Sequence, residues 1–129
     1  MITIDPQQEI FTALKLNLEA KGYSEVDGVL PPEDTPYPFV RLRDSQQSDI
    51  PLKNAKHGRV RQTIHLFHLV KKRGELSEIM QVIRAVCESI KHTANYSWNV
   101  TDITERILYD NTTKTPLLHG VVEVEFYFS

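Results

Sequence analysis

Residues 117–128 read LLHGVVEVEFYF, and from Val122 onward apolar side chains alternate with polar ones. Successive side chains of a strand point to opposite faces, so this alternation predicts a strand with one buried face and one wet face. The wet face would carry Glu123, Glu125 and Tyr127, and the other face would carry valine and phenylalanine. A half-buried strand of this kind is typical of an antiparallel sheet.

Two helices are predicted upstream of this strand. Asp5 and Pro6 form a helix start, and Gly22 provides a stop signal. Between them, apolar residues recur at helical spacing: Ile10, Phe11, Leu14 and Leu18. The second helix follows Gly74 and has the strongest periodicity in the chain: Leu76, Ile79, Met80, Ile83, Val86, Cys87 and Ile90.

Three further strands are expected from alternating or apolar runs, over residues 39–43, 60–70 and 101–109. A short strand is also expected near residues 26–30, in a proline-rich connector that no central strand could cross. The stretch 45–59 is polar, and it predicts a long flexible loop between two strands. Arg41 and Arg43 would lie on the wetter face of the preceding strand.

The order helix, strands, helix, strands predicts a single α+β domain spanning residues 1–129. Two helices would pack on one face of a mainly antiparallel sheet. The chain has 129 residues, a formal net charge of −2 and one cysteine, so an intrachain disulfide is excluded. The first residues lack the pattern of a secretory signal, and no apolar run reaches membrane-spanning length. We therefore expect a soluble cytoplasmic protein.

Candidate catalytic and metal-binding residues do not form a recognisable set. His65 and His68 are three apart in a predicted strand, so they would face opposite sides and could not share a metal ion. Cys87 falls on the apolar stripe of the second helix and is expected in the core. The acidic pairs, Glu33 with Asp34 and Glu123 with Glu125, lack an evident acid or base partner. We expect no enzymatic activity, metal or cofactor.

Two basic stretches raise the question of nucleic-acid binding. The first comprises Lys53, Lys56, His57, Arg59 and Arg61, and the second comprises Lys71, Lys72 and Arg73. Such residues could clamp phosphates, but solvated surface charge is the preferred interpretation because no aromatic side chains are interleaved with them. The net charge of −2 also gives no support to nucleic-acid binding.

Several stretches resemble a known family. These are residues 34–42 (DTPYPFVRL), 44–51 (DSQQSDIP), 60–67 (VRQTIHLF) and 72–74 (KRG). Together they resemble the small tail-completion or tail-terminator proteins of long-tailed bacteriophages and prophages. The likeness covers residues 36–128 in the order and spacing of elements.

The resemblance implies a non-enzymatic subunit that closes into a ring, typically a hexamer. Such a ring caps the tail tube and offers a surface for the head, so its partners would be other copies, the tail-tube protein and a head–tail connector protein. The protein would occupy the host cytoplasm during assembly and then the tail or neck of the virion. Candidate contact residues are Arg41, Arg43, Lys53, Lys56 and Arg59. Two alternatives remain open: a head–tail connector subunit, and a small nucleic-acid-binding regulator.

Overall fold

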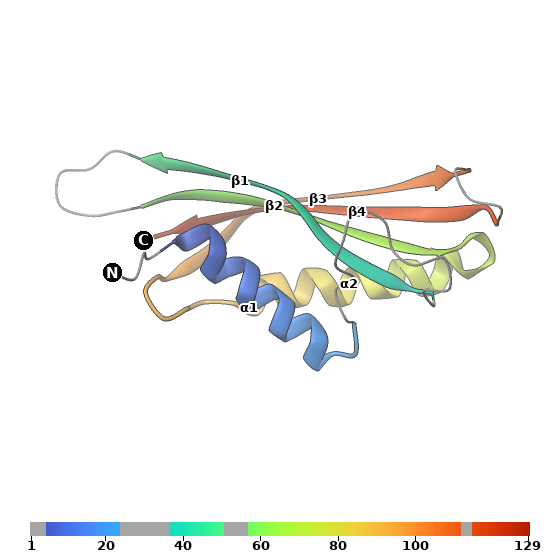
Figure 1. Ribbon diagram of the computed structural model, residues 1–129, viewed down its shortest axis with the longest axis horizontal. Coiled ribbons are helices and arrows are strands. Elements are labelled where there is room, and N and C mark those ends of the chain that lie inside the picture. Colours follow the sequence, from blue (N-terminus) through green and yellow to red (C-terminus); the bar gives the residue numbers. More distant parts are fainter. Residues whose placement is uncertain (1–4, 24–36, 51–56, 112–114) are drawn as a thin grey trace.

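A computed structural model of the chain describes residues 5–23, 37–50, 57–111 and 115–129. Its elements follow the predicted order of helix, strands, helix, strands (Figure 1). They are α1 (Pro6–Ala20), β1 (Phe39–Ile50), β2 (His57–Leu69), a short 3-10 turn (Val70–Lys72), α2 (Arg73–Ser89), β3 (Trp98–Asp110) and β4 (Leu117–Phe128). The strand predicted near residues 26–30 lies outside the described residues.

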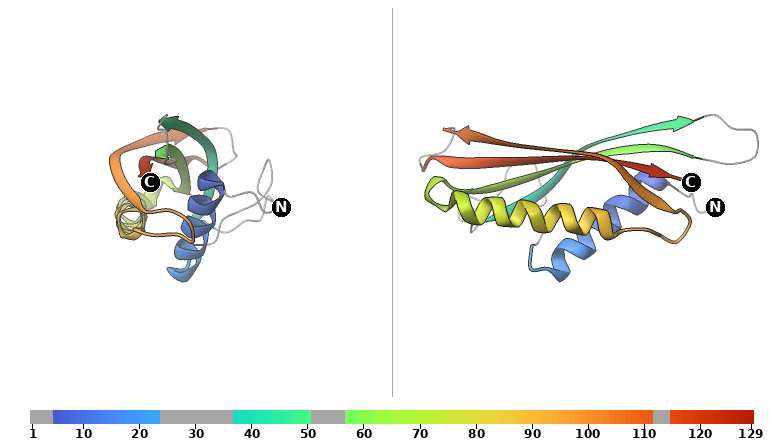
Figure 2. Two further views of the ribbon diagram at one scale, coloured as in Figure 1. Left: turned by 90° about the vertical axis from the view of Figure 1, so that its left-hand side faces the viewer. Right: turned by 180° about the vertical axis from the view of Figure 1, so that it is seen from behind.

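The four strands form one antiparallel sheet in the order β1-β2-β4-β3. Both helices lie against the same face of this sheet, which arches over them when viewed end-on (Figure 2). The predicted α+β class, with helices on one face of an antiparallel sheet, is therefore confirmed. The opposite face of the sheet, which we call the helix-free face, carries no helix of the described chain.

The helices owe their positions to their apolar stripes. Asp5 caps α1 by accepting a hydrogen bond from the backbone N–H of Gln7. Ile10, Leu14 and Leu18 follow at helical spacing and are fully buried. In α2, the residues that repeat at spacings of three and four are also buried: Leu76, Ile79, Met80, Ile83, Val86 and Cys87. The core lies between these stripes and the inward side chains of the sheet.

The strand β4 supplies the centre of that core. Val122, Val124, Phe126 and Phe128 are fully buried, whereas Glu123 and Glu125 are partly exposed on the helix-free face. Residues 117–128 thus adopt the half-buried strand that their alternation predicts. Because β4 pairs with β2 on one side and β3 on the other, it holds the two halves of the sheet together.

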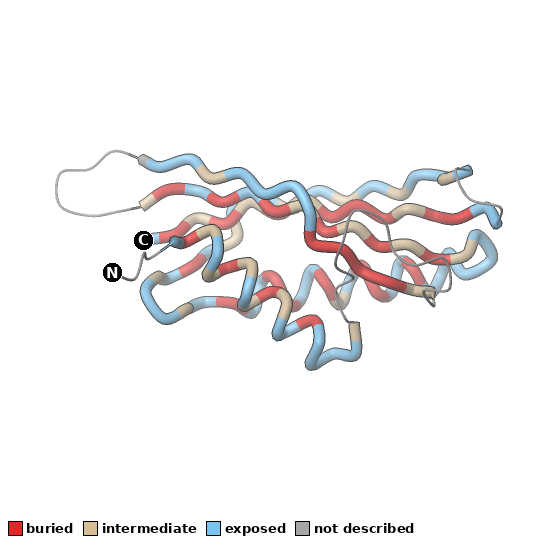
Figure 3. Tube along the Cα trace, in the orientation of Figure 1, coloured by how far each residue is buried: buried red, intermediate tan, exposed pale blue. Residues whose placement is uncertain are grey.

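The predicted long loop over residues 45–59 is wrong at both of its ends, residues 45–50 and 57–59, and its middle, residues 51–56, lies outside the described residues. Residues 45–50 continue β1 and residues 57–59 begin β2, with register pairs that include Ser45 with Gln62 and Ser48 with Arg59. This part of the hairpin is largely exposed (Figure 3). Backbone hydrogen bonds can pair two strands whatever the polarity of their side chains. The polar composition of these residues was therefore not sufficient evidence for a loop.

A side-chain network ties the start of α1 to the connection between α2 and β3. The carboxylate of Glu9 accepts hydrogen bonds from the Thr93 hydroxyl at 2.6 Å and the Asn95 side-chain amide at 2.6 Å. The backbone N–H of Asn95 donates a third. The indole of Trp98 in turn donates to the Thr93 hydroxyl. The three bonds to Glu9 join segments that are more than 80 residues apart in the sequence.

In the described part of the chain, neither helix is both long enough and apolar enough to cross a membrane.

Candidate protein-interaction surface

The helix-free face carries a ladder of ion pairs between neighbouring strands. Arg61 of β2 lies 3.0 Å from Glu125 and 3.7 Å from Glu123, both on β4. Arg59 approaches Glu125 from the same strand as Arg61, at 3.5 Å. On the other flank, Arg106 of β3 lies 3.6 Å from Glu123. The ladder therefore pairs the acidic side chains of β4 with arginines from both of its neighbours.

The surroundings of Glu125 lower the pKa of its carboxyl group. The largest cause is a hydrogen bond from the Thr101 hydroxyl, and the bond and charge of Arg61 add to it. The arginines are exposed and the glutamates are partly exposed to solvent, so each ion pair is worth only about 0.2–1 kcal/mol. The ladder gives the face a fixed pattern of charge but supplies little of the fold's stability.

A row of stacked rings crosses the same face near one end of the sheet. Tyr37 stacks on Phe39 with ring centroids 5.5 Å apart, and Phe39 stacks on Phe67 at 5.0 Å. Phe67 stacks on His119 at 4.4 Å, and His119 stacks on His65 at 5.0 Å. The rings come from β1, β2 and β4 and the residues just before β1, so they make this end of the face apolar and rigid.

Two histidines and an aspartate meet at the edge of this row. The Nδ1 atom of His65 lies 2.8 Å from Nε2 of His119, and its Nε2 atom lies 3.3 Å from Oδ2 of Asp44. Asp44 has a φ of 61° at an irregularity in the β1–β2 register. Burial, followed by the nearby His65, lowers the pKa of His119. This pair was missed from the sequence because the two histidines are 54 residues apart.

His65 and His68 do face opposite sides of β2, as predicted. His65 lies on the helix-free face, whereas His68 is buried on the other side with its Nε2 atom 3.3 Å from Glu75 of α2. Within the described residues, no group of three histidine, cysteine, aspartate or glutamate side chains could hold a metal ion. Cys87 is buried in α2, where desolvation raises the pKa of its thiol to about 12.

The three candidate contact residues that the structure describes, Arg41, Arg43 and Arg59, differ in their surroundings. Arg43 is exposed, and Arg59 lies in the ion-pair ladder. Arg41 shares a face with Arg43, as predicted, because the two residues pair in register with His65 and Thr63 of β2. The expected exposure is wrong for Arg41, which is only 7% exposed. Lys53 and Lys56 lie outside the described residues.

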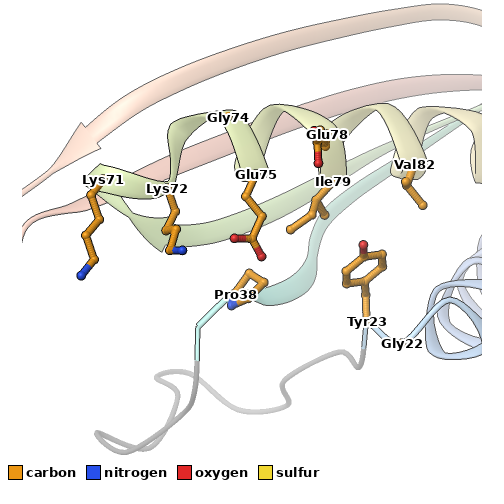
Figure 4. Close-up of a pocket in the computed structure, with 10 residues that line it drawn as sticks. All are labelled: Gly22, Tyr23, Pro38, Lys71, Lys72, Gly74, Glu75, Glu78, Ile79 and Val82. Carbon is orange, nitrogen blue, oxygen red and sulfur yellow. The ribbon is translucent and has the colours of Figure 1, made fainter.

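An open pocket of about 900 Å³ lies beside the start of α2 (Figure 4). Tyr23 and Pro38 form one side of it, and the other side is formed by Lys72 of the 3-10 turn and by Glu75 and Glu78 of α2 (Figure 4). Its ten lining residues include no histidine, cysteine, serine or aspartate. The lining therefore holds no serine or cysteine nucleophile and no histidine ligand.

Comparisons with known proteins identify the fold. No family model matches the chain, and no curated protein matches it either. Among solved structures, the chain is similar to one in a structure entitled "Virion of native gene transfer agent (GTA) particle". The TM-score is 0.65 with 10% sequence identity, and the match covers 95% of this chain and 93% of that one. Nearly the whole of both chains therefore shares one fold.

Proposed function

We propose that this protein is a structural subunit of a phage-like particle, and specifically that it caps the tail tube as a tail terminator. The observation that carries the proposal is the fold shared, end to end, with a chain from a gene transfer agent virion. The resemblance of residues 36–128 to tail-completion proteins supports the narrower role. The protein would act by packing and charge complementarity, without covalent chemistry.

The helix-free face suits such a role. It presents arginines and glutamates held in place by one another, next to a rigid row of stacked rings. Charges fixed in this way favour selective, correctly oriented docking more than raw affinity. In the proposed function, this face or the sheet edges beside it would meet neighbouring subunits and the tube.

Deletion of the gene in its own particle-producing strain tests the proposal. Electron microscopy of the particles should then show tails longer than normal, because nothing ends tube growth. Re-expression of the protein should restore normal length. Finished tails of normal length beside unjoined heads would instead assign the protein to the head–tail connector. Normal particles in the absence of the protein would reject both roles.

Nucleic-acid binding is less well supported by the geometry. Arg59 and Arg61, the structurally described arginines of the first basic stretch, are engaged with Glu123 and Glu125. A phosphate clamp would have to compete with these carboxylates. A DNA mobility shift whose affinity falls steeply with salt would nevertheless support that role, and its absence at low salt would count against it.

A further inference from the structure

Exposed apolar side chains gather at one end of the sheet. Within the described residues, four large hydrophobic side chains are exposed, and three of them are Val70, Leu108 and Tyr109. Leu108 is 42% exposed and Tyr109 is 69% exposed, and both belong to β3. Val70 follows the last residue of β2, at the same end. The fourth, Leu16, lies apart on α1.

The strand that carries Leu108 and Tyr109 is an edge of the sheet. Among the described elements, β3 pairs only with β4, and β1 pairs only with β2. A strand at a sheet edge presents backbone N–H and C=O groups that can pair with another chain. An apolar end on such a strand adds a favourable contact for any chain that pairs with it.

The two edge strands, β1 and β3, are complementary in direction and in the position of their apolar ends. Each strand is antiparallel to its neighbour across four strands, so β1 and β3 run in opposite directions. A copy placed beside the first in the same orientation would therefore offer β1 antiparallel to β3. The register runs from Phe39 through Phe67 and His119 to Leu108. The apolar ends of both edges thus lie at the same level.

The polar ends of the two edges also lie level. Another row runs from Ser48 through Arg59 and Tyr127 to Asn99, so serine would face asparagine across the junction. Between these two rows of register partners, a third row begins at Arg41 on β1 and ends at Arg106 on β3. Across the junction, Arg106 of one copy would therefore lie beside Arg41 of the next. Glu123, 3.6 Å from Arg106, offsets the repulsion between these two cations.

We propose that copies of this protein join head to tail, with β3 of one copy paired antiparallel to β1 of the next. Leu108 and Tyr109 would then pack against the end of β1 that begins at Phe39. The inference rests on the proposed function, for which it names the contact between subunits of the ring. A head-to-tail contact uses two different surfaces and can close into a ring. In a twofold contact between two β3 strands, the apolar end of one copy at Leu108 would instead lie beside the polar end of the other copy at Asn99.

Substitutions at the apolar end provide the first test. Leu108→Lys with Tyr109→Lys should leave the monomer folded, because both side chains are exposed, but should raise the concentration for half-assembly about tenfold or more. Leu16→Lys, on a leucine of α1 that is more exposed than Leu108, should assemble like the wild type. Native mass spectrometry over a concentration series measures this. A wild-type protein that stays monomeric throughout, or a double variant that assembles normally, would overturn the proposal.

A designed disulfide provides the second test. Ser48→Cys and Asn99→Cys lie on the same row but three strand spacings apart, roughly 14 Å, which is beyond the Cα separation of about 7 Å that a disulfide tolerates. Any bond between them must therefore join two copies. The buried, weakly acidic thiol of Cys87 should not compete.

Oxidation of the double variant should produce a ladder of covalent oligomers, whereas an equal mixture of the two single variants should stop at dimers. Each single variant alone should remain monomeric on a denaturing gel. Dimers from Asn99→Cys alone would mean that two copies meet with Asn99 beside Asn99, which the head-to-tail arrangement does not allow. That result would overturn the arrangement, as would a lack of cross-links in the double variant.

The two proposals fail separately. If the cross-links do not form but loss of the gene still gives over-long tails, the strand contact is wrong and the terminator role stands. If the cross-linked ladder forms but tails without the protein are normal, the contact stands and the terminator role is wrong.

Discussion

Single side chains in this protein hold together segments that are distant in the sequence. Glu9 is the clearest example, since its carboxylate binds both Thr93 and Asn95. Partial burial alone would raise the pKa of Glu9, but the hydrogen bonds from Thr93 and Asn95 outweigh burial and lower it. The ionised carboxylate is therefore the form that stabilises the fold.

Replacement of Glu9 by alanine should destabilise the protein by about 1–3 kcal/mol, because the hydrogen-bond donors of Thr93 and Asn95 lose a charged acceptor. Urea unfolding followed by circular dichroism measures the change. Glu19→Ala is the matched control, because Glu19 is exposed on the same helix, and it should shift stability by no more than about 0.5 kcal/mol. Equal effects of the two substitutions would contradict the role assigned to Glu9.

His119 should make folding stability depend on pH. Its pKa in the folded protein lies below the usual value of 6.5, chiefly because of burial and then because of His65; Arg106 also lowers it, while Asp110 raises it. As pH falls, His119 therefore binds a proton at a higher pH in the unfolded chain than in the folded protein. This contribution to stability is complete above about pH 6.5 and is lost as pH drops through the lowered pKa.

His119→Phe should weaken that pH dependence while keeping the ring stacked on Phe67. The measurement compares the urea midpoint at about pH 7.5 and about pH 5.5. The wild type should lose more stability between the two than the variant does. His92→Gln is the control, because His92 is exposed and should leave the pH dependence unchanged. A wild-type midpoint that does not fall on acidification would refute this role of His119.

At the scale of an element, the long hairpin of β1 and β2 depends on the close approach of its strands at Gly58. A Cβ atom at this position would collide with the carbonyl oxygen of Ser48, and it would lie 2.9 Å from the Cα atom of Asp49 and 3.0 Å from the ring of Phe128. Two of these neighbours are backbone atoms and cannot rotate away. Only glycine allows the hairpin to pair this closely where β2 begins.

Gly58→Ala should therefore destabilise the fold by about 1–3 kcal/mol, since backbone must shift to admit the methyl group. Gly74→Ala is the opposite case: its added Cβ meets nothing within 4 Å and lies in helix α2, where alanine is favoured by about 0.5–1 kcal/mol. Thermal unfolding of both variants should show midpoints moving in opposite directions. A neutral Gly58→Ala would mean that the strands separate there at little cost.

At the scale of the whole molecule, stability should be greatest in the central strands and least at the edges. Ile64 of β2 and Val122 of β4 are paired with each other and fully buried. The outer half of β1 and much of β3 are exposed. Local opening costs least where few buried contacts must be broken.

Hydrogen exchange of the dilute monomer should therefore be slowest around Ile64 and Val122 and faster in residues 45–49 and in β3. On assembly through the proposed contact, amides of β3 and β1 should become more protected, while those of α1 should change little. Mass spectrometry of peptic fragments measures both effects. Equal protection of residues 45–49 and Ile64 in the monomer would contradict the expected order.

Pattern and spacing were enough to locate the elements of this fold. The alternation in residues 117–128 and the stripe from Leu76 to Cys87 predict a strand and a helix, and both are present with those apolar faces buried. Periodicity works here because it reflects which side of an element meets the core. The same reasoning failed over residues 45–49, where the strand is paired but largely exposed and no buried face leaves a pattern.

What the sequence determined by itself was the class of fold, the order of the elements and the core position of Cys87, because each depends on local periodicity. Only the tertiary structure decided the strand order, the pairing of His65 with His119, the anchoring of Glu9 and the burial of Arg41. These features depend on which distant segments become neighbours. That choice is made by the packing of the whole chain and leaves no mark in the spacing of nearby residues.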